Sequence, residues 1–149
     1  MLLPIAMLIA QAAPTAAQPC PATEVALPAG LAGWRETTAG PAIGKAFVVP
    51  GADPETVHGL TDAEIARAGR AMLVPFEVED EGTYRVALSD GAWIDVVAGP
   101  TVLPAVAHSH GPRCSGIHKI VDFRLRRGRY ALQISGMKAP SVRVLIVRA

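Results

Sequence analysis

From residue 73 to the carboxyl end, apolar and polar residues alternate along this chain, and that period of two limits the fold more than any other feature. The clearest stretch is 117–126. One face would carry Ile117, Lys119, Val121, Phe123 and Leu125, and the other His118, Ile120, Asp122, Arg124 and Arg126. Turn residues such as Asp90-Gly91 and Arg127-Gly128 separate the alternating runs. The pattern predicts an all-β protein, an antiparallel β-sandwich or jelly roll of seven to nine short strands.

The strands can be placed by composition and by turn signals. We expect them at 45–50, 55–60, 73–79, 84–88, 92–97, 101–107, 117–125, 130–134 and 142–146. Pro75 is typical of an edge strand or a bulge. The run Thr61-Asp62-Ala63-Glu64 is typical of a helix start with Thr61 as the cap, which predicts one short helix. A loop that crosses the sandwich is the alternative, because Gly69 follows closely.

The first 17 residues have the pattern of a secretory signal peptide. They contain no Asp, Glu, Lys or Arg, carry an apolar run over 2–10 and end in Thr15-Ala16-Ala17. This run is too short to span a membrane. We therefore predict a signal peptide at 1–17, an extended lead-in at 18–44 and a single β-sandwich domain at 45–149. The mature protein is expected in the periplasm or outside the cell, without stable membrane insertion.

Export gives meaning to the two cysteines, Cys20 and Cys114. An oxidising compartment allows thiols to pair, and two cysteines leave one intramolecular pairing. We expect a Cys20–Cys114 disulfide that tethers the lead-in beside the histidine-rich stretch 107–118. Trp34 and Trp93 are read either as a stacking platform for a sugar or as core residues and cover for the disulfide.

Net charge is +1, which argues against nucleic acid as a partner. The charges are nevertheless segregated along the chain. Residues 53–95 hold ten acidic and three basic side chains, whereas 113–148 hold nine basic and one acidic. One interpretation is a pair of solvated faces that attract each other across the sandwich. The other is an anion-binding face built from Arg124, Arg126, Arg127 and Arg129.

Most of the chain's candidate chemistry lies in 107–118. His108 and His110 are two residues apart, so in a strand both rings would project from one face, as a metal pair requires. His118, Asp122 and His58 are the candidates for a further ligand. Two His and a carboxylate would suit iron, and three His would suit zinc or copper. Alternatively, the turn at Gly111 splays the rings and the histidines bind no metal.

Three stretches, 82–96, 108–117 and 128–136, resemble a group of short exported proteins of sphingomonad-type alphaproteobacteria. The resemblance covers roughly residues 70–148. Members often carry the label homogentisate 1,2-dioxygenase, which implies an iron site, although that enzyme is a larger cupin and no Glu lies near His108 and His110. In the group's pattern His108, His110 and Cys114 match, whereas Arg is more usual at the position of His118. The resemblance therefore implies a site at the His108/His110 pair.

The closing strands are also similar to bacterial pre-peptidase C-terminal modules, which are jelly-roll sandwiches attached to secreted enzymes. Two functional hypotheses follow. The first is a non-enzymatic, exported binding or accessory domain whose His108/His110 loop contacts an unidentified small ligand or a protein partner. The second is a small cupin-like enzyme of the dioxygenase type. It would depend on a divalent transition metal, zinc, copper or iron, held by His108 and His110 and completed by His118, Asp122 or His58.

Overall fold

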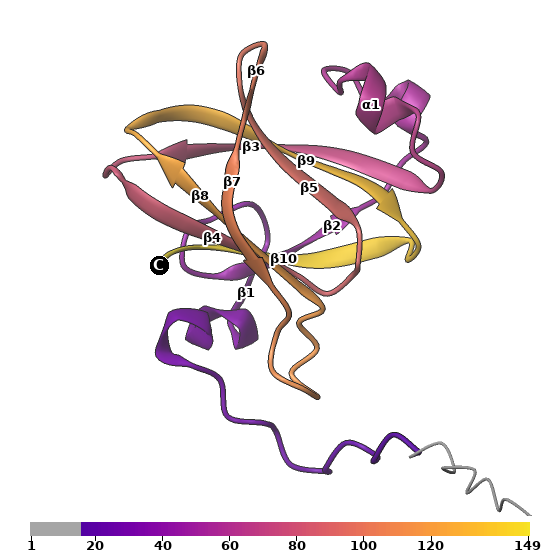
Figure 1. The fold of residues 1–149 in the computed structure, drawn as a ribbon, viewed down its shortest axis with the longest axis vertical. Coiled ribbons are helices and arrows are strands. Elements are labelled where there is room, and N and C mark those ends of the chain that lie inside the picture. Colours follow the sequence, from indigo (N-terminus) through magenta and orange to yellow (C-terminus); the bar gives the residue numbers. More distant parts are fainter. Residues whose placement is uncertain (1–15) are drawn as a thin grey trace, which may run out of the picture.

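The computed structural model describes residues 16–149 and places them in two stacked β-sheets (Figure 1). In spatial order, the six-stranded sheet contains β1 (Thr37–Thr38), β2 (Ala46–Pro50), β10 (Ser141–Arg148), β4 (Gly82–Leu88), β8 (Lys119–Leu125) and β7 (Ala105–Ser109). The four-stranded sheet contains β3 (Arg70–Val78), β9 (Gly128–Met137), β5 (Trp93–Ala98) and β6 (Thr101–Leu103). All neighbouring strands are antiparallel except β1 and β2. The predicted all-β sandwich is confirmed.

The main core lies between the two sheets and is formed by alternate residues of their strands. The six-stranded sheet contributes, among others, Phe47, Val86, Val121, Phe123 and Val144, and the four-stranded sheet contributes Val74, Val78, Ile94, Leu132 and Ile134. Each of these side chains is buried. Because successive strand residues point to opposite faces, the residues between them lie on the outer faces of the sandwich. Those outer faces are where the two sheets differ.

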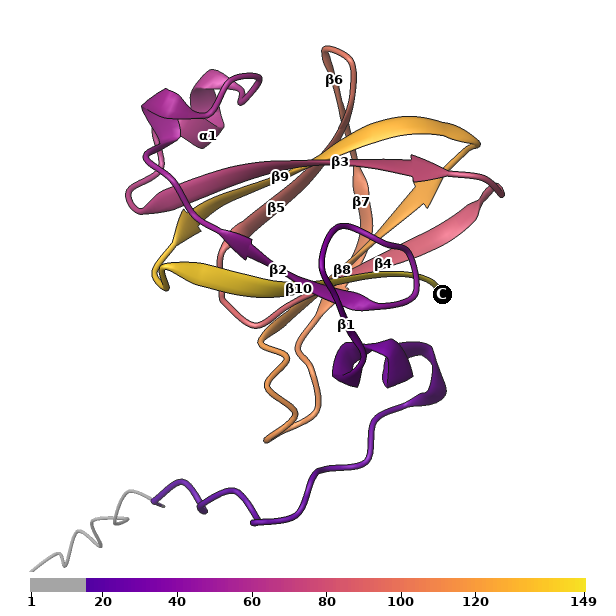
Figure 2. The ribbon, with the colours of Figure 1, turned by 180° about the vertical axis from the view of Figure 1, so that it is seen from behind.

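A different short element covers the outer face of each sheet. The 3₁₀ helix η1 (Ala29–Arg35) packs against β10 of the six-stranded sheet, and the helix α1 (Asp62–Ile65) packs against β9 of the four-stranded sheet. Figures 1 and 2 show both elements on the outside of the sandwich, at opposite ends of the molecule. No helix within residues 16–149 is long and apolar enough to cross a membrane.

Several predicted elements are confirmed. The strand at 45–50 is β2, and β3, with Pro75 in it, is an edge strand. The helix start is also confirmed, because Thr61 Oγ1 accepts a hydrogen bond from the Glu64 N–H at 3.4 Å. The predicted signal peptide, 1–17, falls almost wholly outside the described residues.

Three details of the prediction are wrong. Residues 55–60 do not form a strand, because Asp53 caps a short 3₁₀ helix, η2 (Pro54–Thr56), and accepts from the Glu55 N–H. The strand at 101–107 is divided at Pro104 into β6 and β7, which belong to different sheets. With β1, this division brings the described chain to ten strands. The lead-in at 18–44 is not extended throughout, because η1 lies within it.

Candidate functional site

A disulfide fastens the loop between β7 and β8, residues 110–118, to the amino-terminal segment. The Cys20–Cys114 bond joins residues 94 positions apart, with Cα atoms separated by 5.5 Å. The predicted pairing is confirmed. The loop is also held from η1, since the indole Nε1 of Trp34 donates to the Ser115 carbonyl at 3.2 Å. These contacts fix the end of β7 relative to the rest of the sandwich.

Trp34 belongs to a second apolar cluster on the outer face of the six-stranded sheet. The cluster is formed by Leu31, Trp34, Ala46, Ala87, Ile117, Ile120 and Leu145. η1 contributes Leu31 and Trp34 and the loop contributes Ile117, and all three side chains are buried. Arg143 donates to the Trp34 carbonyl at 3.0 Å, and its guanidinium lies 5.7 Å from the ring centre. Trp34 is therefore a core residue and not part of a sugar-stacking platform.

Strand β7 is the exposed edge beside this fastened loop. All five of its residues are exposed, and β8 is its only neighbour within the described chain. Its outer edge therefore presents backbone N–H and C=O groups that no strand within 16–149 pairs. The segment 101–109 contains no charged residue, and Val102 and Val106 are 46% and 56% exposed. Edge strands are protected by charge, by proline, by a bulge or by being short. β7 is short, follows Pro104 and is bulged between Ala105 and Ala107, but it carries no charge.

The three histidines of the region lie along and just beyond this edge. His108 is in β7, opposite Val121 of β8, whereas His110 follows the last strand residue. The Nδ1 of His110 donates to the His118 carbonyl at 3.0 Å. The His110 and His118 rings are nearly perpendicular, with centres 6.1 Å apart. All three rings are exposed.

The further metal-ligand candidates do not join the histidines. Asp122 is paired with Arg85 of β4, whose Nε and Nη2 donate to the two carboxylate oxygens at 2.9 and 2.8 Å. The hydrogen bonds to Asp122 raise the pKa of the Arg85 guanidinium, so Arg85 remains charged. His58 lies in the turn after η2, next to Gly59. The Gly59 carbonyl accepts a hydrogen bond from Gln133 of β9, in the four-stranded sheet that does not contain β7. Within residues 16–149, no group of three or more His, Cys, Asp or Glu side chains is placed to hold a metal ion.

The four candidate anion-binding arginines lie at one end of the sandwich. Arg124 is in β8, Arg126 and Arg127 form the turn to β9, and Arg129 is in β9. All four are exposed, and none forms an ion pair with another described residue. Glu77 of β3 lies directly opposite Arg129 in the sheet register. Acidic side chains therefore adjoin the arginines, which weakens the positive field available to an anion.

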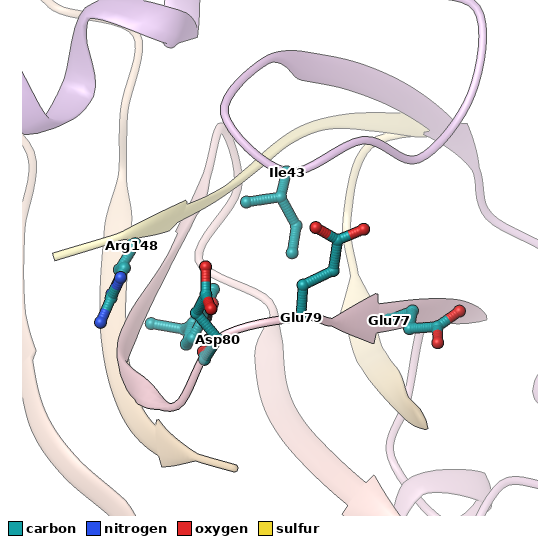
Figure 3. Close-up of a pocket in the computed structure, with 6 residues that line it drawn as sticks. Ile43, Glu77, Glu79, Asp80 and Arg148 are labelled. Atoms are coloured by element: carbon teal, nitrogen blue, oxygen red, sulfur yellow. Dashed lines mark hydrogen bonds between the residues drawn. The ribbon is translucent and has the colours of Figure 1, made fainter. Parts of the chain in front are cut away.

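A shallow cavity of about 450 Å³ opens at the same end (Figure 3). It is lined by Ile43, Glu77, Glu79, Asp80, Tyr84 and Arg148. Tyr84 donates to the Asp80 carbonyl at 2.7 Å, and Arg148 donates to the Glu81 carbonyl at 2.8 Å, so the cavity wall is held by its own turn. The acidic segment 53–95 and the basic segment 113–148 therefore lie side by side at the turns after β3 and β8.

A buried polar cluster lies beneath α1, and the sequence gives no signal for it. The side chain of Glu64 is fully buried, as are Gln133 and Ser135 on the outer face of β9. Glu64 Oε2, Gln133 Oε1 and Ser135 Oγ have no hydrogen-bond partner within the described chain. Glu64 Oε1 lies 3.4 Å from Arg67 Nη1. The cap motif at 61–64 places Glu64 in the first turn of a helix. It does not indicate that β9 lies beneath that turn.

The electrostatics of this cluster are unusual for a surface element. The pKa of Glu64 is raised to about 7, mainly by burial and also by the nearby Asp95 carboxyl group, although the Arg67 guanidinium lowers it. Asp95 accepts a hydrogen bond from the Trp93 indole at 3.0 Å, and Arg67 lies 4.3 Å from the centre of that ring. Glu64 therefore retains its proton at pH values well above those at which an exposed carboxyl group ionises.

These features define a class of structure: an antiparallel β-sandwich, fastened by one disulfide, with an uncharged exposed edge. A disulfide of this kind is typical of proteins that fold outside the cytosol. No protein-family model matches the chain, and no curated protein matches it at a significant level.

Proposed function

We propose that this chain is an exported binding or accessory domain, periplasmic or secreted, that holds an extended segment of a partner protein along the free edge of β7. The single observation behind this proposal is the edge itself, which is exposed over its whole length and carries no charge. The disulfide and the pattern of residues 1–17 support the location. The proposal develops the binding-domain hypothesis rather than the metal-enzyme hypothesis, whose three-ligand site the described residues do not form.

The chemistry of the edge favours a polypeptide as the ligand. A row of unpaired backbone donors and acceptors is complementary to another extended backbone, which can add as a further strand of the sheet. Side chains of the added strand would meet Val106 and His108, which are neutral or weakly basic. An uncharged segment with apolar residues at alternate positions would therefore fit best.

The surroundings of β7 lower the cost of binding. Adding a strand is favourable only when the receiving edge is already ordered, because ordering residues on binding costs free energy. The loop after β7 is held by the disulfide and by the Trp34–Ser115 hydrogen bond. The edge therefore stays extended before the partner arrives. The Nδ1 of His110 donates to the His118 carbonyl across the loop, which adds one more hydrogen bond at the end of β7.

A peptide library tests the proposal. Peptides of about eight residues, the length of a typical strand with its flanks, would be selected on the immobilised protein, and the affinity of the enriched sequences measured by fluorescence polarisation. We expect extended, uncharged sequences to bind the wild type and to lose most of their affinity for Val106→Lys. The matched control is Val48→Lys on β2, because Val48 is 49% exposed on the same sheet but is not on the β7 edge.

Two results would contradict the proposal. One is equal binding of the selected peptides to the Val106→Lys variant and the wild type. The other is concentration-dependent self-association of the wild type in sedimentation, abolished by Val106→Lys, which would assign the edge to a second copy of the chain. Export has its own check, since the protein recovered from the periplasm or the medium should begin near Gln18 rather than at Met1.

A further inference from the structure

The two strands at one side of the sandwich belong to a single continuous stretch of chain. β6 is the last strand of the four-stranded sheet and β7 is the last strand of the six-stranded sheet, and only Pro104 separates them. Because one stretch of chain carries both strands, the two sheets end on the same side of the sandwich. Figures 1 and 2 show β6 and β7 following one another along that side. We call residues 101–109 the edge segment.

The edge segment is exposed along almost its whole length. Only Leu103, which packs against the main core, is half-buried, and the other residues are exposed. Neither β6 nor β7 has a second neighbouring strand within residues 16–149, so each leaves one row of backbone N–H and C=O groups unpaired. β7 alone has five residues, whereas the edge segment extends over about 30 Å. The two strands together therefore offer a long edge, although β7 by itself is short.

The strands at the other side of the sandwich are protected. β1 has only two residues. β3 carries the charged Arg70 and Glu77 and contains Pro75. The start of β3 is also covered, since Ala52 and Ala71 exchange backbone hydrogen bonds of 2.9 Å. Charge, proline and covering backbone all hinder the addition of a strand. The edge segment carries no charge and has no covering chain among the described residues, so this side is the one open to a partner.

The middle of the edge segment cannot form a regular ladder. Pro104 has no N–H to donate. The pairing of β7 with β8 shifts between Ala105 and Ala107, which leaves one residue in a bulge. Regular backbone pairing with an added strand is therefore limited to the two ends of the edge segment, 101–103 and 107–109.

We infer that the partner contributes an extended segment of about nine residues that pairs with β6 and β7 together and so joins the two sheets along one side of the sandwich. This inference rests on the proposed binding of a partner segment to β7, and it assigns that segment a length and a chemistry. A charged side chain beside Val102 or Val106 would lose hydration, because the edge segment has no opposite charge to pair with it. The partner segment is therefore uncharged, and its middle residues need no backbone N–H.

Affinity measurements on the full mature chain test the inference. Peptides of about twelve residues, long enough to cover the edge segment with short flanks, would be selected on the immobilised protein. The tightest of them, labelled with fluorescein, is the probe for fluorescence polarisation. Val102→Lys and Val106→Lys should each weaken its binding by on the order of tenfold, because a charge replaces an apolar contact in each strand. Val48→Lys, at an exposed position of β2, is the matched control and should bind the probe as the wild type does.

Methylation of the peptide backbone gives a second measurement that needs no variant of the protein. Each N–H of the probe is replaced in turn by N–CH₃, which removes one hydrogen-bond donor. We expect the positions that lose affinity to fall in two groups separated by tolerant residues, because only the two ends of the edge segment form ladders. A single group of sensitive positions would show that the peptide pairs with one strand alone, and the inference would then be wrong.

The variants distinguish failure of this inference from failure of the proposed function. Binding that requires Val106 but not Val102 overturns the inference and leaves the peptide-binding edge of β7 intact. Binding that requires neither residue, or Val102 alone, contradicts both. A selection that enriches no peptide also contradicts both.

Discussion

The two outer covers of this sandwich solve the same problem with different chemistry. η1 and α1 are both short, and each lies over the outer face of one sheet. η1 buries Leu31 and Trp34 in an apolar cluster, and a disulfide lies beside it. α1 buries Glu64 against polar side chains and has no covalent fastening.

The difference predicts how each cover responds to conditions. Burial of apolar surface does not depend on pH, so the η1 cover should persist wherever the domain is folded. Glu64 is fully buried and its pKa is raised to about 7, so the α1 cover should depend on pH. A fold of this size can thus carry one permanent and one conditional cover.

The largest expected effect is on the permanent cover. Replacing Cys20 and Cys114 by Ser opens a loop of 94 residues. In the chain-entropy model, this loss lowers the free energy of unfolding by about 4 to 5 kcal/mol. Urea denaturation of the double variant measures it, and reduced wild type is the control. A loss below about 1 kcal/mol would show that the lead-in is not a permanent cover.

The second largest loss in the free energy of unfolding is expected for Trp34→Ala. Truncating a buried tryptophan costs about 3 to 5 kcal/mol, because transfer free energy and packing are both lost. The matched control is Trp93→Ala, because Trp93 is 49% exposed. Its truncation should cost about 1 kcal/mol or less. Urea denaturation at acid pH compares the two. Equal losses would remove the distinction between the covers.

The conditional cover predicts a smaller effect that depends on pH. Because the pKa of Glu64 is raised when folded, its contribution is full below pH 4.5 and is lost as the pH rises to about 7. Relative to Glu64→Gln, the wild type should lose up to about 3 kcal/mol over that interval, and less if the α1 segment opens before the domain unfolds. Stability that rises with pH over this interval relative to Glu64→Gln would contradict the assignment.

The smallest expected effect concerns the β7 edge. Val106→Lys replaces an exposed side chain, so the free energy of unfolding should stay within about 0.5 kcal/mol of the wild type at either pH. The same thermal or urea unfolding experiment measures it. A large loss would show that Val106 supports the fold, and the edge would then be a structural rather than a binding element.

The strands could be predicted from the sequence because their information is local. The alternation over 117–125 and the Asp90-Gly91 turn correspond to β8 and to the β4–β5 connection. The disulfide could be predicted because the chain has two cysteines and the pattern of residues 1–17 indicates an oxidising compartment. The cover at Glu64 could not be predicted, because its burial depends on which outer-face residues of β5 and β9 lie beneath it. For the same reason, the sequence makes Asp122 a candidate ligand, although Arg85, far away in sequence, pairs with it.

The central claim, that one cover is permanent and the other conditional, is tested most directly by denaturant-dependent hydrogen exchange at about pH 7.5. The probes are the Trp34 indole N–H, bound to the Ser115 carbonyl, and the amide of Ala66, bound to the Asp62 carbonyl. We predict that the indole exchanges only through global unfolding, whereas the Ala66 amide exchanges through a local opening of much lower free energy. Exchange of both through the same global event would contradict the account.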